Sequence, residues 1–447
     1  MDTHIPILYK QYGDYVTKSK MIIGVDGLLP VQRRVLLTTH LLAKTHIMQS
    51  SRILGENYGR FHPYALADGT ITWAVLNGLV DGVGSFGNII GVHDISASAP
   101  RYTSIKSNKL MHDMLFKYVN FVPWEEDQAD KEPVYLPSML PVALFIKEYI
   151  SHPAFGYKPV IPTYKTKDII KRLFSLIEGN ENKPVIKPEI YGCKTLSSKE
   201  ECRKLLETGE GIIDLQGLYS IEGDEIVVKG WKPGIKFKSL LVRIDRYKKW
   251  NLLTNKEIGW IDESSVDSDD EYFKPILPKV RFKVIKRDPS IFSKMKEAIE
   301  EKLKSRICFK VYIVKDGNII SPSIDQMLLD CFVLYSNAFK KYLEDKLFKL
   351  NNKLEENIIL SKIKPIINKF KDKDIKEQIT LIAQHIKEKE ERIKEIVDKY
   401  SVSKLIAINV DISGIMNEIN TCKSELSDIN KSIIADYSSI YNQFGGK

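Results

Sequence analysis

The sequence DGLLPVQRRVLLTTHLL at residues 26–42 contains a turn, a helix start and an apolar helical face in succession. The initial Asp-Gly is typical of a turn, and Pro30 suits the first position of a helix, where its missing N–H would have no partner anyway. The apolar residues that follow recur at helical spacing, which predicts an amphipathic helix over about 31–43. Arg33 and Arg34 fall in its first turns, where a cation is well placed to contact phosphate.

A second helix is expected near 51–59, and the segment 82–91 is rich in glycine. Two helices joined by a short connection, followed by a glycine-rich β segment, are the parts of a winged helix-turn-helix. Such a unit places one helix against DNA. The N-terminal region, 1–160, is therefore predicted to be a winged-helix domain.

The middle region, 161–328, mixes helical and β patterns. Residues 211–231, GIIDLQGLYSIEGDEIVVKGW, contain two β-rich runs around Glu222-Gly223-Asp224, which predicts a hairpin. The sequence of 232–244 fits a helix, and that of 273–285 fits a strand. These patterns indicate an α+β domain.

The C-terminal region, 329–447, carries the pattern of long helices, because no glycine occurs between Gly317 and Gly414. Apolar residues recur with a period of about 3.5 in 342–363 and in 382–400, which predicts two coiled-coil arms. The more apolar stretch 403–426 is expected to form a helical knob that buries itself against a second copy through a two-fold interface. The alternative is a monomeric helical bundle.

Composition narrows the class of protein. With 447 residues, of which 43% are hydrophobic, the chain is long enough for about two to four packed domains. Its 67 Lys and Arg against 58 Asp and Glu give a net charge of +9, a mild bias toward polyanions such as nucleic acid. The five scattered cysteines indicate neither a disulfide framework nor a zinc site. No apolar stretch is long enough to span a bilayer, so a soluble cytoplasmic protein is expected.

Five segments appear in a distinctive order: DGLLPVQRRVL at 26–36, SRILGENYGRFHP at 51–63, VDGVGSFGN at 80–88, APRYTSI at 99–105 and EPVYLPSMLPVAL at 132–144. Their order and spacing resemble the DNA-cleavage subunit of type IIA DNA topoisomerases, which include the A subunits of gyrase and topoisomerase IV. Length, and the absence of a C-terminal DNA-wrapping region, make the medium subunit of the split phage enzymes the nearest likeness. Without that region, the protein is not expected to introduce negative supercoils in the manner of gyrase, unless an unrelated partner changes this.

The resemblance implies a multidomain α+β fold. The winged-helix domain, 1–160, would form a DNA gate, and 161–328 would be an α/β tower domain. Residues 329–447 would form a long antiparallel coiled-coil arm that ends in a helical dimerisation knob. Two copies would meet at the DNA gate and again at the knob.

The resemblance also assigns roles to individual residues. Tyr102 would attack a DNA phosphodiester and form a transient bond to the 5′ phosphate, which preserves the bond energy for rejoining. A phenol is a weak acid, so it needs a nearby base or cation. Arg101 would stabilise charge on the reacting phosphate, or would merely anchor the backbone. His62 matches the first histidine of the family's His-Pro-His sequence, and Lys20 is the expected substitute for an arginine that the family has near Ser19.

The sequence departs from the family after Pro63. Tyr64 stands where gyrases have a second histidine, and Ala65, Leu66 and Ala67 replace polar residues, which puts drug contacts that depend on them in doubt. For the apolar wedge that the family inserts between base pairs, Pro153 and Phe155 are the candidates, with ordinary loop packing as the alternative. Contacts with the DNA backbone are expected from six basic residues: Arg33, Arg34, Arg52, Arg60, Lys106 and Lys109.

No phosphate-binding loop for ATP is visible, and no metal site is predicted on this chain. The acidic groups at 222–224 and 267–269 resemble magnesium-binding elements of TOPRIM domains, but they lack the flanking βαβ pattern. Mg²⁺ and ATP are therefore expected on a partner subunit with TOPRIM and ATPase domains, in a heterotetramer that holds a homodimer of this chain on double-stranded DNA. The rival hypothesis is a non-catalytic architectural DNA-binding protein with a coiled-coil dimer arm.

Overall fold

The structure is a computed structural model, and it describes residues 4–24, 26–62, 67–127, 130–154, 156–232, 235–239, 241, 258–264, 271–284, 289–370, 374–400, 405 and 410–444. Contacts between residues divide the chain into two compact units. The first unit contains Met1–Tyr335 and Tyr437–Lys447, and the second contains Ser336–Asp436. The predicted boundary near 160 falls inside the first unit, so the three-domain division stays a prediction.

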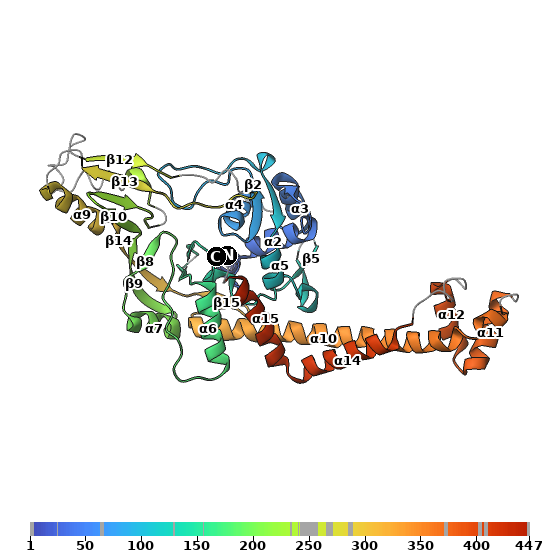
Figure 1. Ribbon diagram of the computed structural model, residues 1–447. Helices are drawn as coiled ribbons and strands as arrows, with labels where there is room; N and C mark the ends of the chain where they lie inside the picture. Colours follow the sequence, from blue (N-terminus) through green and yellow to red (C-terminus); the bar gives the residue numbers. More distant parts are fainter. Residues whose placement is uncertain are drawn as a thin grey trace. The chain divides into compact units, whose positions relative to one another are not determined.

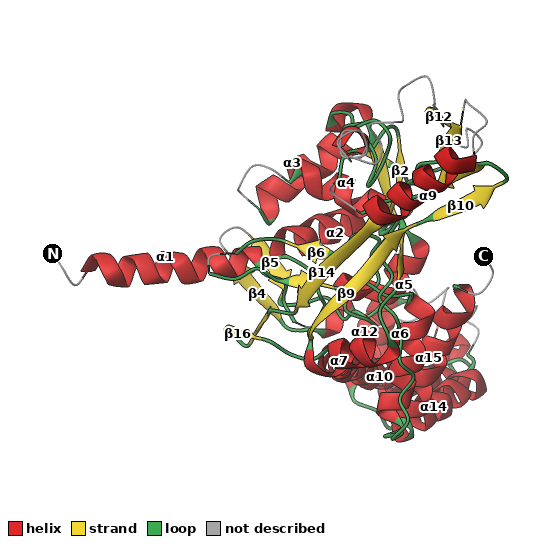
Figure 2. Ribbon diagram, turned by 90° about the vertical axis from the view of Figure 1, so that its left-hand side faces the viewer, coloured by secondary structure: helices red, strands yellow, loops and turns green. Residues whose placement is uncertain are grey.

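The N-terminal part of the first unit groups helices around a small sheet (Figure 1). Its elements are α1 (His4–Lys20), α2 (Pro30–Leu42), β1 (Met48–Gln49), α3 (Ser50–Arg60), α4 (Asp68–Leu76), β2 (Val80–Val83), η1 (Pro100–Tyr102), β3 (Ser104–Ser107) and α5 (Lys109–Leu115). The strands are antiparallel in the order β1-β3-β2. The expected helices at 31–43 and 51–59 are α2 and α3. Figure 2 shows α1 projecting from the rest of this unit.

The α2 helix shows why the segment after the Asp-Gly turn folds as it does. Gly27 has a φ of 69°, and a Cβ there would lie 2.9 Å from the backbone nitrogen of Val142, so only glycine fits the turn. Pro30 occupies the first helical turn, as expected. All residues from Gln32 to His40 are buried, so the middle of the helix is enclosed on every side, and the amphipathic pattern predicted from the sequence is wrong for this stretch.

Two larger sheets form the middle of the first unit. A five-stranded sheet has the order β6-β7-β14-β9-β8, and a four-stranded sheet has the order β10-β11-β13-β12. The bounds of these strands are β6 (Ile150–Ser151), β7 (Val160–Ile161), β8 (Cys193–Thr195), β9 (Glu210–Gly217), β10 (Tyr219–Glu222), β11 (Glu225–Val228), β12 (Ile258–Asp262), β13 (Val280–Val284) and β14 (Lys304–Lys310). The predicted hairpin is confirmed as β10 and β11, joined by a turn in which Gly223 has a φ of 64°.

Helices and small hairpins complete this unit. The helices are α6 (Thr166–Ile177), α7 (Lys199–Thr208), α9 (Pro289–Leu303), η2 (Val119–Phe121) and η3 (Val142–Leu144), and the hairpins are β4 (Trp124–Asp127) with β5 (Asp130–Pro133) and β15 (Ile313–Lys315) with β16 (Asn318–Ile320). Helix α9 covers the four-stranded sheet through a core that contains Trp231, Phe282 and Met295. The strand predicted at 273–285 is shorter than expected. Of the helix predicted at 232–244, residues 237–239 and 241 are helical, whereas 233–234, 240 and 242–244 lie outside the described residues.

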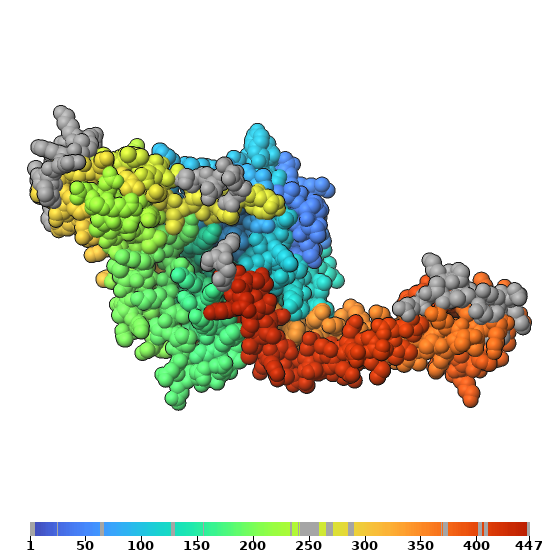
Figure 3. Space-filling model, viewed as in Figure 1, coloured from blue at the N-terminus to red at the C-terminus, as the bar shows by residue number. Residues whose placement is uncertain are grey.

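The segment before β13 lies against the small N-terminal sheet. The Phe273 N–H donates to the Gly82 carbonyl oxygen at 2.7 Å, and the rings of Phe273 and Phe86 meet edge to face with centroids 5.6 Å apart. In the space-filling view, described residues of this segment (yellow) lie beside the cyan N-terminal residues (Figure 3). The small sheet is therefore in direct contact with the segment that leads into the four-stranded sheet.

The second unit is built from helices. Its elements are the C-terminal part of α10 (Ile324–Ile363), η5 (Ile367–Phe370), α11 (Ile375–Ile386), α12 (Glu390–Lys399), α14 (Ile412–Ser427) and the first residues of α15 (Ile429–Gln443). Leu350 on α10 packs with Ile415 and Ile419 on α14, and the Cys422 thiol donates to the Leu343 carbonyl oxygen. These pairs show that α10 and α14 run antiparallel.

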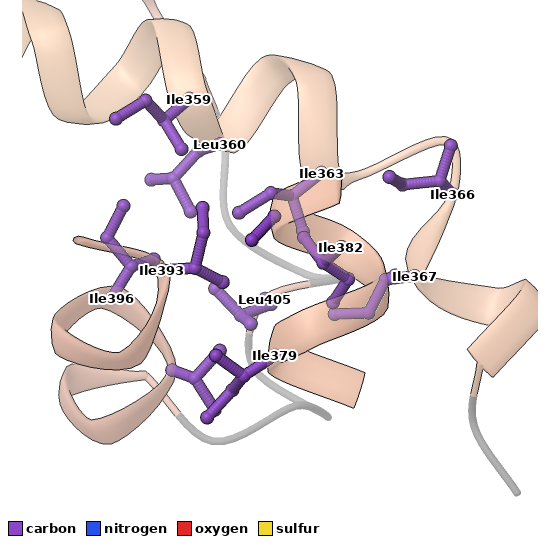
Figure 4. Close-up of a cluster of buried hydrophobic side chains, with 12 residues drawn as sticks. Ile359, Leu360, Ile363, Ile366, Ile367, Ile379, Ile382, Ile393, Ile396 and Leu405 are labelled. Carbon is purple, nitrogen blue, oxygen red and sulfur yellow. The ribbon is translucent and has the colours of Figure 1, made fainter. Parts of the chain in front are cut away.

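The helices after α10 follow a different order from the one predicted from the sequence. The continuous helix expected over 382–400 is wrong, because Lys387 adopts a left-handed φ of 56° and separates α11 from α12. Both helices join a globular cluster with the end of α10, around Ile363, Ile382 and Ile393 (Figure 4). The return helix is α14, which falls in the stretch 403–426 where the sequence predicts the knob.

Candidate active site

Tyr102 is the last residue of the short helix η1, and its side chain is 68% exposed. The guanidinium carbon of the adjacent Arg101 lies 4.7 Å from the centroid of the Tyr102 ring. A guanidinium over an aromatic face is attracted by the ring quadrupole. The arrangement presents a phenol oxygen to solvent with a permanent cation beside it.

Backbone and side-chain hydrogen bonds tie η1 to the start of α3. Gln49 donates through Nε2 to the Arg101 carbonyl oxygen at 2.7 Å, and the Ser50 N–H donates to the Thr103 carbonyl oxygen at 2.9 Å. The Thr103 hydroxyl donates to the Ser50 hydroxyl at 2.9 Å. The exposed tyrosine therefore stands on a fixed backbone rather than on an unattached loop.

A second group of predicted residues meets at the end of α3. Arg34, on α2, donates from Nε and Nη2 to the two carboxylate oxygens of Glu132, each at 2.7 Å. Its third nitrogen, Nη1, lies 3.3 Å from Nδ1 of His62. Burial, and then the nearby Arg34 charge, lower the pKa of His62, while Glu132 opposes the shift. The imidazole is thus favoured in its neutral form.

The neighbouring Arg33 occupies a different environment. Its Nε donates to Oδ2 of Asp26 at 2.7 Å, and both side chains are buried, with Asp26 at 0% exposure. The same carboxylate accepts hydrogen bonds from the backbone N–H groups of Leu28 and Leu136. Arg33 therefore has a partner in the interior, and we leave it out of the proposed DNA surface.

The other predicted DNA contacts fall into two classes. Arg60 donates to Asp130 at 2.8 Å, a bond that lowers the pKa of this carboxyl group, and Lys106 donates to the Tyr272 hydroxyl at 3.2 Å, which raises the pKa of the lysine. Two others are exposed, Arg52 on α3 and Lys109 on α5. Lys20, which was predicted to replace a family arginine in the active site, is also exposed, at the end of α1. To bind DNA, Arg60 and Lys106 would have to release the hydrogen bonds that they make to Asp130 and Tyr272. The structure records no such bond for the exposed residues among those it describes.

Of the two wedge candidates, Pro153 is exposed in the segment between β6 and β7, whereas Phe155 lies outside the described residues. The divergent residues Tyr64, Ala65 and Leu66 also lie outside them. Whether either candidate enters DNA stays a prediction.

The structure brings predicted residues together in two groups, Arg101 with Tyr102 and Arg34 with His62. Sequence reasoning missed the two carboxylates, Asp26 and Glu132, that hold the α2 arginines. Both residues stand inside segments that carry the family resemblance. Asp26 is a carboxylate within a largely apolar run, which is a signal of a buried ion pair, whereas Glu132 follows Asp130 and Lys131 and carries no such signal.

Within the part of the chain that the structure describes, no group of three or more His, Cys, Asp or Glu side chains is arranged to hold a metal ion. In the acidic segment 222–224, Glu222 is bonded to Arg281 at 2.8 Å, which lowers the pKa of Glu222; the segment 267–269 lies outside the described residues. No helix among the described residues is long and apolar enough to cross a bilayer.

Comparison with known proteins confirms the family resemblance. The DNA gyrase A subunit of Helicobacter pylori is 30% identical over 56% of this chain and 32% of its own length. The DNA gyrase A subunit of Neisseria gonorrhoeae is 31% identical over 60% of this chain and 31% of its own length. The DNA topoisomerase 4 A subunit of Neisseria gonorrhoeae is 28% identical over 48% of this chain and 30% of its own length.

The chain thus spans about a third of the length of the curated relatives that it matches. The likeness to the phage medium subunit stays a prediction. The family model for the A subunits of DNA gyrase and topoisomerase IV matches residues 24–443, which is most of the chain. The chain belongs to the family of DNA gyrase and topoisomerase IV A subunits.

Proposed function

We propose that this chain is the DNA breakage and rejoining subunit of a type IIA DNA topoisomerase, and that Tyr102 is its nucleophile. The observation that carries the proposal is the exposed Tyr102 phenol beside the Arg101 guanidinium, on a backbone fixed to α3. Family membership supports the reaction class. Because the chain spans only part of the length of its relatives, the activity of the whole assembly is also part of this proposal.

In the proposed reaction the Tyr102 oxygen attacks a phosphorus atom of the DNA backbone. A bond forms between the phenol oxygen and phosphorus, and the bond from phosphorus to the 3′ oxygen breaks. The phenol loses its proton and the departing 3′ oxygen gains one. Rejoining is the reverse, and it needs no external energy because the phosphotyrosyl ester keeps the energy of the broken bond.

Arg101 contributes a cation next to the nucleophile, since its guanidinium lies over the Tyr102 ring. Charge develops on the non-bridging phosphate oxygens as the bond to phosphorus forms, and fixed cations stabilise such charge. Because the Arg101 side chain is exposed next to the nucleophile, it is positioned to contact the same phosphate.

The fold supports the finer architecture that the resemblance implies. In our proposal α2 and α3 with the β1-β3-β2 sheet form the winged helix, and the four- and five-stranded sheets belong to the tower. The antiparallel α10 and α14 helices form the arm, and the cluster of α11 and α12 forms its globular end. Two copies would pair at the winged helices and at the globular ends, and double-strand passage would relax and unlink DNA.

Mg²⁺ and ATP are proposed to bind a partner subunit with TOPRIM and ATPase domains. The described residues of this chain do not fit a magnesium site, because they bring no three candidate ligands together. We therefore derive no step through the metal from this chain. Magnesium would supply further neutralisation of phosphate charge when the partner holds it.

The test is a cleavage assay on supercoiled plasmid, quenched with denaturant, using the chain co-purified with its TOPRIM/ATPase partner in the presence of Mg²⁺. Tyr102→Phe removes the nucleophile, and Tyr12→Phe is the matched control because Tyr12 is 66% exposed on α1. We expect linear DNA with protein on its 5′ ends for wild type and Tyr12→Phe, and none for Tyr102→Phe. DNA binding without a covalent adduct in wild type would favour the architectural protein instead.

A further inference from the structure

The side chain of the proposed nucleophile has little packing to orient it. Tyr102 is 68% exposed, and the adjacent Arg101 is exposed as well. The direction in which these two side chains leave the chain is therefore set by the backbone between them. Because a peptide unit is planar, a rotation of the unit that joins Arg101 to Tyr102 changes ψ of the first residue and φ of the second together.

Gln49 contacts this peptide unit directly. Its side-chain Nε2 donates at 2.7 Å to the Arg101 carbonyl oxygen, which is the oxygen of that unit. The N–H of the same unit, on Tyr102, donates to the Ala99 carbonyl oxygen at 2.9 Å within η1. Both polar groups of the unit are therefore held, one by the local helical turn and the other by a side chain 52 residues away in sequence.

The backbone of Gln49 is itself fixed by the small sheet. Gln49 is the last residue of β1, and it pairs with Ser104 on β3, the strand that follows η1. The next residue, Ser50, donates its N–H to the Thr103 carbonyl oxygen at 2.9 Å. In the described structure the side chain of Gln49 makes no capping hydrogen bond to α3, so its amide is available to η1. The amide thus reaches the peptide unit from a backbone that is already in register with β3.

We propose that Gln49 is a positioning residue for the breakage reaction: its amide holds the peptide unit between Arg101 and Tyr102, so that the phenol and the guanidinium are oriented toward the same phosphate. The inference rests on the proposed function for its substrate. Gln49 acts through the Arg101 carbonyl oxygen and does not contact the reacting atoms. Because Gln49 is exposed, its hydrogen bond replaces one to water and contributes little to the stability of the fold.

The test compares Gln49→Met with Gln49→Lys. Methionine has a similar length and no donor, whereas lysine restores a donor of sufficient reach. The rate of covalent adduct formation is measured with the TOPRIM/ATPase partner and Mg²⁺ over a range of DNA concentrations. We expect Gln49→Met to lose at least about tenfold in rate at saturating DNA, because a reacting group displaced by about 1 Å can lose about 10²-fold. Its half-saturating DNA concentration should not change, and Gln49→Lys should recover most of the lost rate.

Gln326→Met is the matched control, because Gln326 is an exposed glutamine on α10 whose Nε2 also donates a hydrogen bond, to Asp330 at 2.8 Å. This variant should cleave as wild type does, and all variants should melt at the wild-type temperature. The proposal is wrong if Gln49→Met keeps the wild-type rate at saturating DNA, if only its DNA affinity falls, or if Gln49→Lys recovers nothing. A wild-type enzyme that forms no adduct would instead refute the proposed function.

A second measurement needs no cleavage activity. The chain contains two Arg-Tyr pairs, at 101–102 and 246–247, so labelling with ¹³C-carbonyl arginine and ¹⁵N tyrosine marks two peptide units, and Tyr102→Phe identifies the signal of the first. The chemical shift of a carbonyl carbon changes when its oxygen loses a hydrogen bond. We expect the shift of the first unit to change in Gln49→Met and to stay as in wild type in Gln326→Met. The same shift in all three proteins would overturn the proposal whatever the cleavage assay shows.

Discussion

The arginines of α2 and the arginine of η1 share one predicted task, contact with phosphate, but they lie in opposite environments. Arg33 and Arg34 are 4% and 9% exposed and are paired with Asp26 and Glu132. Arg101 is exposed and lies over an aromatic ring rather than against a carboxylate. An arginine that is buried and already paired with a carboxylate is poorly placed to bind a phosphate. We therefore distinguish the buried, paired arginines, which stabilise the site, from the exposed Arg101, which can contact the substrate.

This contrast predicts different consequences for the two classes. Removing one partner of a buried ion pair leaves an uncompensated charge in a poorly solvated place. Removing an exposed cation leaves the fold intact and changes only what the surface can bind or stabilise. Substitutions in the buried ion pairs should therefore lower the free energy of unfolding. Substitutions of exposed arginines should instead change the cleavage rate or the DNA affinity.

The largest expected effect is on stability, from Asp26→Asn. The neutral amide leaves Arg33 charged and buried, and it loses an acceptor that also serves Leu28 and Leu136, so we expect a loss of about 3–5 kcal/mol in unfolding free energy. Urea denaturation measures this loss. The matched control is Asp214→Asn, which breaks an ion pair of the same 2.7 Å length with the exposed Arg306. If Asp26→Asn and Asp214→Asn lower the free energy of unfolding equally, burial does not distinguish the two ion pairs and the contrast drawn above is wrong.

The next effect is on catalysis, from Arg101→Ala. We expect cleavage at saturating DNA to fall by about 10²–10³-fold, because a preorganised cation beside the nucleophile is lost. The melting temperature should not change, since the side chain is exposed. If only the DNA affinity falls and the cleavage rate at saturation is kept, Arg101 is a backbone anchor and has no part in the chemistry.

The stability of the fold should depend on pH through His40, a buried histidine on α2. The His40 ring is stacked on Phe116 with centroids 4.3 Å apart, and burial, the nearby His112 and Lys44 lower its pKa to about 4. Between about pH 6.5 and about pH 4 the unfolded chain binds a proton that the folded chain excludes, so stability is lost as the pH falls. The total is about 3 kcal/mol from the difference between the two pKa values.

Urea denaturation at pH 7 and pH 4.5 measures this loss. His40→Leu should flatten the dependence in that interval, whereas His93→Leu, at a side chain that is 74% exposed, should leave it as in wild type. An unchanged slope in His40→Leu would mean that other groups cause the acid sensitivity.

Local signals predicted the elements that a short segment specifies by itself. The turn, Pro30 and the apolar spacing located α2, and Glu222-Gly223-Asp224 located the hairpin of β10 and β11. The five-stranded sheet was not predicted, because its strands come from 150–310 and pair over long distances in sequence. The break at Lys387 was missed as well, since neither glycine nor proline marks it.

For the site, sequence alone named residues but not their environments. The motif containing Tyr102 singled out one of 21 tyrosines, and the structure places it in the open. The same reasoning treated Arg33 and Arg34 alike as phosphate contacts. Their acidic partners lie 7 and 98 residues away in sequence, and only the folded chain shows which carboxylate meets which arginine.

The smallest expected effect is on the salt dependence of DNA binding, from Arg52→Ala. Each phosphate neutralised by a protein cation contributes about 0.9 to the slope of log affinity against log salt, through release of bound counterions. Because Arg52 is exposed on α3, the helix to which the Tyr102 backbone is tied, its loss should lower the slope by about one. Arg306→Ala is the control, since Arg306 is exposed but paired with Asp214 on the five-stranded sheet. Equal changes in both variants would show that the slope depends on the net charge of the protein and not on a phosphate contact at α3. The position of an arginine would then not predict its part in DNA binding.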